Sequence, residues 1–218
     1  MNITEYILND FHPLTTQSTI KEALKLCEMY PITHIPVLDN TDYVGCISQT
    51  DLLTIDNKDE NLKESIDIFD HFHVNSTQAL LDVLKIFANN DTNILPVIEN
   101  HNYLGYVDLN AILDEFSQTP FLSADGFILV VEKNTTDYTM SEVSQIIESN
   151  NGIILGCYES KRNNEKVEIT LKISSQEINE IIQTFRRYNY TIITEHKDDI
   201  YLEELKNRAD YLQNFLNT

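Results

Sequence analysis

A pattern of apolar positions recurs in the first half of the chain after 60 residues. The segment 19–27 (TIKEALKLC) has apolar residues at i, i+3, i+4 and i+7, and the segment 79–87 (ALLDVLKIF) repeats them. This spacing predicts an amphipathic helix in each copy, because it puts the apolar side chains on one face. Thr19, followed three residues later by Glu22, predicts a capping box at the start of the first helix.

Short apolar runs follow both helices. HIPVLD at 34–39 aligns with ILPVIE at 94–99, and YVGCIS at 43–48 aligns with YLGYVD at 103–108. Runs of this length predict buried strands. A second helix is predicted after them, beginning near Asp51 in the first copy. The chain therefore carries one α/β unit twice.

The pattern changes after Pro120, which is predicted to end the preceding helix. Further strands are predicted at 126–132, 152–160, 166–174 and 190–196, and further helices at 139–149 and 174–188. Two more capping boxes, Thr139 with Glu142 and Ser174 with Glu177, are predicted to begin these helices. The order strand, helix, strand, strand, helix, strand is that of a ferredoxin-like unit.

The final segment, 198–218, is predicted to be a helix with an apolar seam. The seam consists of Leu202, Leu205, Ala209, Leu212 and Leu216. Steps of three and four residues are typical of a and d positions, but two heptads are too short for a stable coiled coil. Docking on its own domain and contact with a second chain are both consistent with the pattern.

Net charge distinguishes the two halves of the chain, whose 218 residues carry −20 in total. Residues 1–119 contain five lysines, no arginine and 19 acidic residues, a net charge of −14, and residues 120–218 contribute −6. Binding to the phosphates of nucleic acids or anionic membranes needs clustered Lys and Arg, so we expect neither as a partner. The acidic first half also disfavours a polyphosphate ligand.

The cysteines, histidines and apolar runs bear on location and metal binding. Cys27, Cys46 and Cys157 are far apart and have apolar neighbours, which predicts small core residues rather than a disulfide framework or a zinc site. His71 and His73 alternate, but no third metal ligand is visible, so we expect no metal. No apolar run approaches the roughly 18 residues of a membrane span, and the first residues lack the features of a signal peptide. We therefore expect a soluble, cytoplasmic protein.

With these elements in place, the sequence resembles a known family. Residues 1–118, with (I/L)PV followed by (V/L)G in each unit, resemble a pair of cystathionine-β-synthase (CBS) domains, a Bateman module, with repeats at about 1–58 and 59–118. Residues 124–197 resemble an ACT domain in element order. The whole arrangement, with the helix at 198–218, is similar to small bacterial acetoin-utilisation-like proteins. The expected fold class is mixed α/β (α+β).

The resemblance implies a regulatory protein. In the family, two CBS units pack about a pseudo-twofold axis, and clefts between them bind adenosine ligands such as AMP, ADP, ATP or S-adenosylmethionine. Such modules often pair as disc-shaped dimers, and ligand occupancy alters an attached or partner protein. By this resemblance we expect a homodimer that acts on an unidentified protein partner.

One copy of the family's ligand motif is intact. Residues 45–51, GCISQTD, match Gly, two apolar residues, Ser or Thr, two residues, then Asp or Asn. The resemblance implies that Asp51 accepts hydrogen bonds from both ribose hydroxyls, and that Ser48, with Thr50, meets a phosphate. His34 takes the place of a phosphate-facing Arg in many members, and a histidine is only partly charged near pH 7.

The second unit departs from the motif at both informative positions. Asp108 stands in place of the hydroxyl, and Ala111 stands in place of the carboxylate. We therefore expect the second cleft to be empty or adapted to an uncharged group, so that one module holds at most one nucleotide. Gln78, at the start of the second unit's first helix, is the residue expected to complete the first cleft from the other unit.

A second interpretation of the motif needs no ligand. Ser48 can cap a helix, and Asp51 can occupy its third position, near the positive end of the helix dipole. The two hypotheses are thus an adenosine-ligand sensor and a homodimeric interaction scaffold.

We expect no enzyme, because the sequence has neither a catalytic triad nor a glycine-rich phosphate loop. In the ACT-like unit, the loop 132–139 has Asp137 but no Gly, which favours assembly over amino-acid binding.

Overall fold

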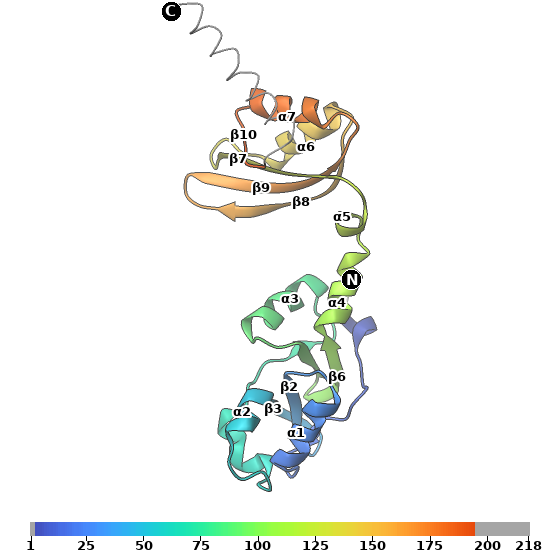
Figure 1. The fold of residues 1–218 in the computed structure, drawn as a ribbon, viewed down its shortest axis with the longest axis vertical. Coiled ribbons are helices and arrows are strands. Elements are labelled where there is room, and N and C mark those ends of the chain that lie inside the picture. The colour runs from blue at the N-terminus through green and yellow to red at the C-terminus, as the bar shows by residue number, and fades with distance from the viewer. Residues whose placement is uncertain (1–2, 195–218) are drawn as a thin grey trace, which may run out of the picture. The chain divides into compact units, whose positions relative to one another are not determined.

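The computed structural model describes residues 3–194. The chain divides into two compact units, Met1–Ser117 and Gln118–Thr218, and each is described by itself. The predicted helix at 198–218 lies outside the described residues. Each unit is a mixed α/β arrangement of one sheet with helices, as predicted (Figure 1).

The elements of the first unit follow the predicted repeat. In chain order they are the 3-10 helix η1 (Ile3–Tyr6), β1 (Leu14–Thr15), α1 (Ile20–Met29), β2 (His34–Asp39), β3 (Asp42–Ser48), α2 (Gln49–Thr54), the 3-10 helix η2 (Leu62–Ile68), β4 (Val74–Asn75), α3 (Leu80–Asn89), β5 (Ile94–Glu99), β6 (Asn102–Asp108) and α4 (Leu109–Ser117). The second helix of each copy begins two residues earlier than expected, at Gln49 and Leu109.

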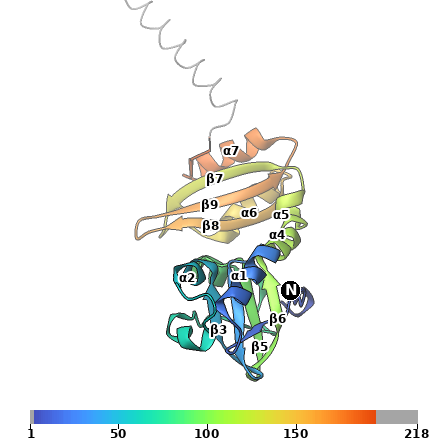
Figure 2. The same ribbon diagram turned by 60° about the horizontal axis from the view of Figure 1, so that its bottom comes forward.

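The strands of both repeats form one sheet. Its order is β1-β2-β3-β6-β5-β4. Strands β3, β5 and β6 of this sheet are labelled in Figure 2. The order is symmetric about the junction of β3 and β6, which meet at Asp42 and Asn102. Thr33 and Asn93, at equivalent positions, bind each other: Thr33 N donates to Asn93 Oδ1 at 2.9 Å, and Asn93 N donates to Thr33 Oγ1 at 3.1 Å.

The two repeats also exchange apolar segments. Ile3, from the N-terminal segment, is buried in the core of the second repeat. Leu62 and Phe69, from the connection between the repeats, are buried in the core of the first. Each repeat therefore buries part of its apolar surface only in the presence of the other.

Each repeat needs its motif glycine for a close crossing of two chain segments. Gly45 and Gly105 have φ angles of +152° and +145°. A Cβ at Gly45 would lie 2.9 Å from the carbonyl oxygen of Asp70, and one at Gly105 would lie 2.5 Å from that of Leu8. The crossings hold the segment that precedes each repeat's first strand against the other repeat.

The second unit begins with a short helix and continues with the predicted order. Its elements are α5 (Pro120–Ser123), β7 (Phe127–Asn134), α6 (Met140–Ser149), β8 (Ile153–Arg162), β9 (Lys166–Ser174), α7 (Ile178–Arg187) and β10 (Thr191–Ile192). The sheet order is β10-β7-β9-β8, with α6 and α7 on one face (Figure 1). Strand β9 alternates as predicted and buries Val167, Ile169, Leu171 and Ile173.

Two predicted capping boxes are present in whole or in part. Thr19 Oγ1 accepts from Glu22 N at 3.2 Å, and Glu22 Oε2 accepts from Thr19 N at 2.8 Å, which confirms the first box. At α6, Thr139 Oγ1 accepts from Glu142 N at 3.2 Å. The Glu142 carboxylate, however, pairs with Lys133 on the neighbouring strand. At α6, therefore, the bond from Glu142 N to the Thr139 side chain is present, but the Glu142 carboxylate binds Lys133 instead of the Thr139 backbone.

Two expectations for the second unit, a capping box and the position of a cysteine, were wrong. Ser174 with Glu177 does not form a capping box, because Ser174 ends β9 and α7 begins four residues later, at Ile178. Pro120 follows the end of α4 as expected, but it also begins α5, where its fixed φ suits the first helical position. Cys157 is exposed rather than in the core, because β8 is the outermost strand of the sheet.

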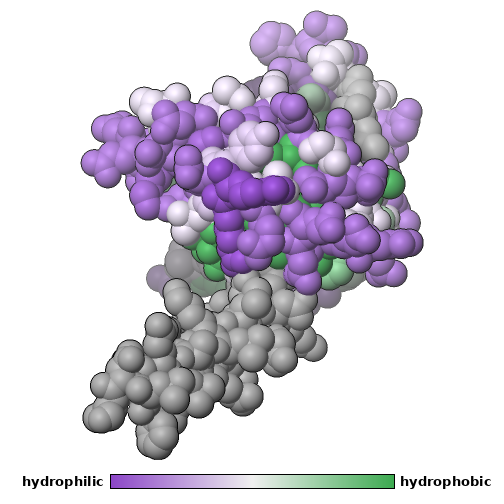
Figure 3. Space-filling view, turned by 90° about the horizontal axis from the view of Figure 1, so that it is seen from above, coloured by the Kyte–Doolittle hydropathy of each residue, from purple (hydrophilic) through white to green (hydrophobic). Residues whose placement is uncertain are grey.

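One face of the described surface is largely polar. Figure 3 shows one face on which hydrophilic residues predominate and hydrophobic residues form small patches. Within residues 3–194, no helix combines the length and apolar character that crossing a membrane requires.

Candidate functional site

The intact motif lies where β3 ends and α2 begins. Ser48 is the N-cap of α2, and its Oγ accepts a hydrogen bond from Asp51 N at 3.0 Å. The same Oγ donates to Asp51 Oδ2 at 2.6 Å and lies 2.9 Å from Thr50 Oγ1. One helical turn thus brings three predicted site residues together, and Ser48 caps the helix as the second interpretation expects.

Ser48 and Thr50 line an open cavity of about 340 Å³, whereas Asp51 is not among its lining residues and reaches it only through its bond to Ser48. The cavity is lined by Thr33, His34, Ser48, Gln49, Thr50, Asp70, Asn90 and Asp91. The first five come from the starts of β2 and α2 in the first repeat. The other three come from the second repeat, before β4 and after α3. Both repeats therefore build the cavity, which is the arrangement that the resemblance implies.

His34 is a buried wall of this cavity. Its Nδ1 lies 2.9 Å from Thr33 Oγ1, and its Nε2 lies 3.5 Å from Asp70 Oδ2. Its ring packs edge-on against Phe72, with centroids 5.3 Å apart. Burial lowers the pKa of His34 below its usual value, although the carboxylates of Asp70 and Asp51 oppose this. The imidazole is therefore mostly neutral at pH 7 and attracts a phosphate weakly.

The charge around the cavity is negative. Asp70 and Asp91 are among its lining residues, which include neither Lys nor Arg. Sequence analysis did not single out Asp70, Asn90 or Asp91. Their positions follow no ligand motif, and they reach the cavity only because the second repeat packs against the first.

Gln78, the residue expected to complete the cleft, binds within the turn that precedes α3. Its Oε1 accepts from Asn75 N at 3.3 Å, and its backbone carbonyl accepts from Ile3 N at 3.4 Å. It is not among the residues that line the cavity. The structure therefore does not bring Gln78 together with the motif residues.

The equivalent turn of the second repeat is capped by a carboxylate. Asp108 Oδ1 accepts from Asn110 N at 2.8 Å and from Ala111 N at 3.2 Å. The carboxylate satisfies two amides at the start of α4 that would otherwise be open to an anion. Ala111 offers no acceptor for a ribose.

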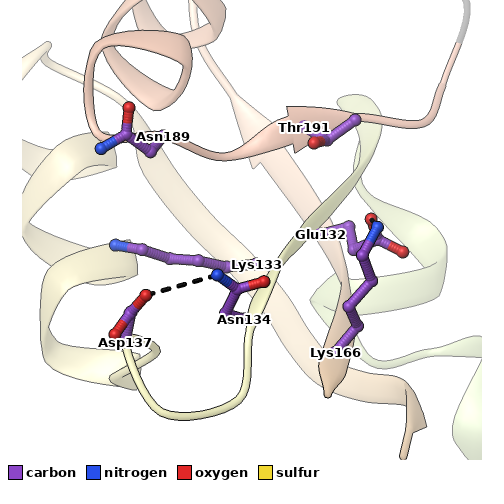
Figure 4. Close-up of a pocket in the computed structure, with 7 residues that line it drawn as sticks. All are labelled: Glu132, Lys133, Asn134, Asp137, Lys166, Asn189 and Thr191. Carbon is purple, nitrogen blue, oxygen red and sulfur yellow. Dashed lines mark hydrogen bonds and ion pairs between the residues drawn. The ribbon is translucent and has the colours of Figure 1, made fainter.

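A smaller cavity, of about 250 Å³, lies in the second unit (Figure 4). It is lined by Glu132, Lys133, Asn134, Asp137, Lys166, Asn189 and Thr191. Both lysines are paired, Lys133 with Glu142 on α6 and Lys166 with Glu132 on β7. Asp137, the residue considered for amino-acid binding, accepts from a neighbouring asparagine side chain at 3.5 Å. A carboxylate ligand would have to displace one of these glutamates.

A family model for the CBS domain matches residues 3–58 and 59–118. The chain belongs to the CBS domain family. The two matched segments contain the two repeats that form the six-stranded sheet and the 340 Å³ cavity, so the first unit is a tandem CBS pair.

Individual known proteins share this region. Inosine-5'-monophosphate dehydrogenase of Methanocaldococcus jannaschii is 28% identical over 111 residues, which are 50% of this chain and 22% of the enzyme. The chain thus spans about a fifth of that relative's length, so the activity of the dehydrogenase is not assigned to this protein.

Two solved structures of CBS proteins are similar to this region. A CBS domain pair/ACT domain protein from Thermotoga maritima is 23% identical and covers 53% of this chain and 96% of its own, with a TM-score of 0.48. CBSX2, solved in complex with AMP, is 18% identical and covers 54% of this chain and 96% of its own, with a TM-score of 0.47.

Proposed function

We propose that the CBS pair senses one adenosine-type ligand, bound in the cavity beside Ser48 and Asp51, and passes its occupancy to a protein partner. The observation that carries this proposal is the asymmetry of the two motifs. The intact one adjoins a cavity built by both repeats, whereas Asp108 and Ala111 replace its hydroxyl and carboxylate in the second repeat. The role proposed is regulatory, without catalysis.

The hydrogen bonds of the motif suggest how a nucleoside is held. Ser48 Oγ now donates to Asp51 Oδ2 at 2.6 Å. The two hydroxyls of a ribose can donate to the same carboxylate. In the proposed complex the ribose replaces Ser48 as donor to Asp51, and the hydroxyls of Ser48 and Thr50 turn to an acceptor on the ligand. Helix α2 keeps its cap, because Asp51 N still donates to Ser48 Oγ.

The charge of the cavity ranks the adenosine ligands. Asp70 and Asp91 line it, and His34 is mostly neutral. Each added phosphate places more negative charge beside these carboxylates, and no Lys or Arg of the lining compensates. AMP and S-adenosylmethionine are therefore favoured over ADP and ATP.

The second unit is proposed to be an ACT-like domain, at about 124–197, that assembles the protein into homodimers. Its strand β8 is at the edge of the sheet and exposes Ile153 by 64% and Tyr158 by 49%. An edge strand offers unpaired backbone groups to another chain.

The proposed location is the cytoplasm. The thiols of the three cysteines are free, which fits a reducing compartment of this kind.

A scaffold without ligand is the second candidate. It is favoured by the network within the motif, because Ser48 and Asp51 satisfy each other as an N-cap and its third residue. The two candidates differ in one measurable property, which is the response of the protein to adenosine compounds.

Thermal unfolding with AMP, ADP, ATP and S-adenosylmethionine, at low salt and with and without magnesium, tests the sensor. A ligand at 100 times its Kd stabilises the folded protein by about 2.7 kcal/mol. We expect AMP or S-adenosylmethionine to raise the unfolding midpoint, and magnesium-free ATP to leave it unchanged. Asp51→Ala, which copies the second repeat's Ala111, should lose most of the shift, whereas the exposed Asp56→Ala should keep it.

Each negative outcome has its own meaning. If no compound shifts the wild type, the scaffold is the better description. If Asp51→Ala responds as the wild type does, the site assignment is wrong. Tight binding of magnesium-free ATP would contradict the ranking by charge.

A further inference from the structure

The second cleft differs from the first in more than its motif. A shift of 60 residues carries Asn90, which lines the first cavity, onto Tyr30. The same shift carries Cys46, beside the first motif, onto Tyr106. Asn90 lines the first cavity, whereas Cys46 is fully buried at the motif strand, and at both equivalent positions the chain has an aromatic ring instead.

A longer chain path brings a third ring to the same place. Leu8 pairs with β6 and Asp70 pairs with β3, through equivalent backbone crossings. The strands that follow these crossings begin at Leu14 and Val74. The N-terminal path from crossing to strand is therefore two residues longer than its counterpart. It contains Phe11, where the shorter path contains Phe72, whose ring packs against His34 rather than against a tyrosine.

The three rings pack together and are held by hydrogen bonds. Phe11 is 4% exposed and stacks on Tyr106, with centroids 4.6 Å apart and planes inclined by 29°. Its centroid lies 5.4 Å from that of Tyr30. Tyr106 Oη donates to Asp10 Oδ2 at 3.3 Å, and Tyr30 Oη donates to the carbonyl oxygen of Asp10 at 3.1 Å. Asp10 thus fixes both phenols around the ring of Phe11.

The cluster lies close to the second motif. Burial raises the pKa of Tyr106 to about 12, and the carboxylates of Asp10 and Asp108 add to the shift. Asp108 is the residue in place of the motif hydroxyl. Tyr106 and Asp108 are two residues apart on β6 and so lie on the same side of the strand, which puts the rings next to the start of α4. The equivalent turn of the first repeat adjoins its cavity.

We infer that Phe11, Tyr30 and Tyr106, together the aromatic plug, occupy the second cleft as a built-in occupant, so that the pair takes one ligand even when the motif is restored. The statement about ligand number rests on the proposed function, whereas the statement about occupancy does not. Two causes would then keep a ligand out of the second cleft: the lost motif and the rings that fill the space. Mutation can separate them.

The first test counts bound AMP per chain by equilibrium dialysis. One variant restores the motif with Asp108→Ser and Ala111→Asp, and a second also removes the plug with Phe11→Ala, Tyr30→Asn and Tyr106→Cys. We expect one AMP for the wild type, one for the motif variant and two for the combined variant. Two for the motif variant, or one for the combined variant, would overturn the inference.

The second test needs no ligand, so it separates failure of the plug from failure of the proposed function. Tyr106→Cys is made in a Cys157→Ser background, and labelling of the new thiol by a neutral maleimide is followed by mass spectrometry. We expect labelling to be at least tenfold faster when Phe11→Ala is added, with folding checked by circular dichroism. Equal rates with and without Phe11 would show that its ring does not fill the cleft.

Discussion

The hydroxyl of Ser48 makes three contacts within one helical turn. It accepts from the backbone of Asp51, donates to the carboxylate of Asp51 and adjoins the hydroxyl of Thr50. At the equivalent place Asp108 accepts from two backbone amides and has no proton to donate. Both residues cap a helix, but only the serine leaves a donor and a neighbouring carboxylate that a ligand can use.

His34 gives a prediction for the pH dependence of stability. Because burial lowers its pKa in the folded protein, the unfolded chain binds the proton more readily. The stability that depends on neutral His34 is fully present above the unfolded pKa of about 6.5 and is lost as pH falls through the folded pKa. Urea denaturation should therefore show the wild type losing stability relative to His34→Gln between pH 7.5 and pH 5.

The control for this prediction is the exposed His12. His12→Gln should change stability by a similar small amount at both pH values. If the difference between the wild type and His34→Gln stays constant or grows at low pH, the burial of the imidazole does not govern its titration.

At the scale of elements, α5 is anchored on β8 by one aromatic side chain. A Cβ at Gly156 would lie 2.2 Å from the ring of Phe121, so the strand needs a glycine at this contact. The ring of Phe121 packs edge-on against Tyr158 with centroids 6.0 Å apart. Lys172 Nζ donates to the carbonyl oxygen of Leu122 at 3.1 Å and holds the same helix.

Gly156→Ala should displace Phe121 and destabilise the protein by about 1–3 kcal/mol, as overpacking does elsewhere. In a Phe121→Ala background the same change should cost much less, because the clashing ring is gone. The four free energies of unfolding, from urea denaturation, form a double-mutant cycle. Equal costs in the two backgrounds would show that Phe121 does not rest on Gly156.

At the scale of the whole molecule, the repeat places two exposed leucines at equivalent positions. Leu53 on α2 is 62% exposed, and Leu113 on α4 is 48% exposed. Burying such side chains between two chains would remove apolar surface from water. The net charge of −20 opposes association, so salt should favour it.

In the proposed homodimer, the exposed leucines of the CBS pair act together with β8 of the second unit, so Leu53→Glu with Leu113→Glu should dissociate it. Sedimentation in moderate salt should find the wild type at twice the chain mass and the double variant at the chain mass. Leu81→Glu is the matched control, because Leu81 is 69% exposed and its counterpart in the first repeat is Lys21. A double variant that remains dimeric would place the dimer contact elsewhere, for instance on β8.

The sequence by itself determined the repeat, the element order and the asymmetry of the motif. Apolar spacing sets which face of a helix or strand is buried, and this depends on near neighbours, so α1, α3 and β9 could be predicted. The motif could be found because Ser48 and Asp51 belong to one helical turn. The capping box at Thr19 was equally local, and it is present.

Only the tertiary structure decided which segments meet. Asp70 and Asp91 reach the first cavity, and Phe11 reaches the second cleft, because each repeat packs against a segment of the other. Such contacts join residues far apart in the chain, and no local spacing encodes them. The carboxylate of Glu142 shows the same competition, since it leaves its predicted capping bond for Lys133 on a neighbouring strand.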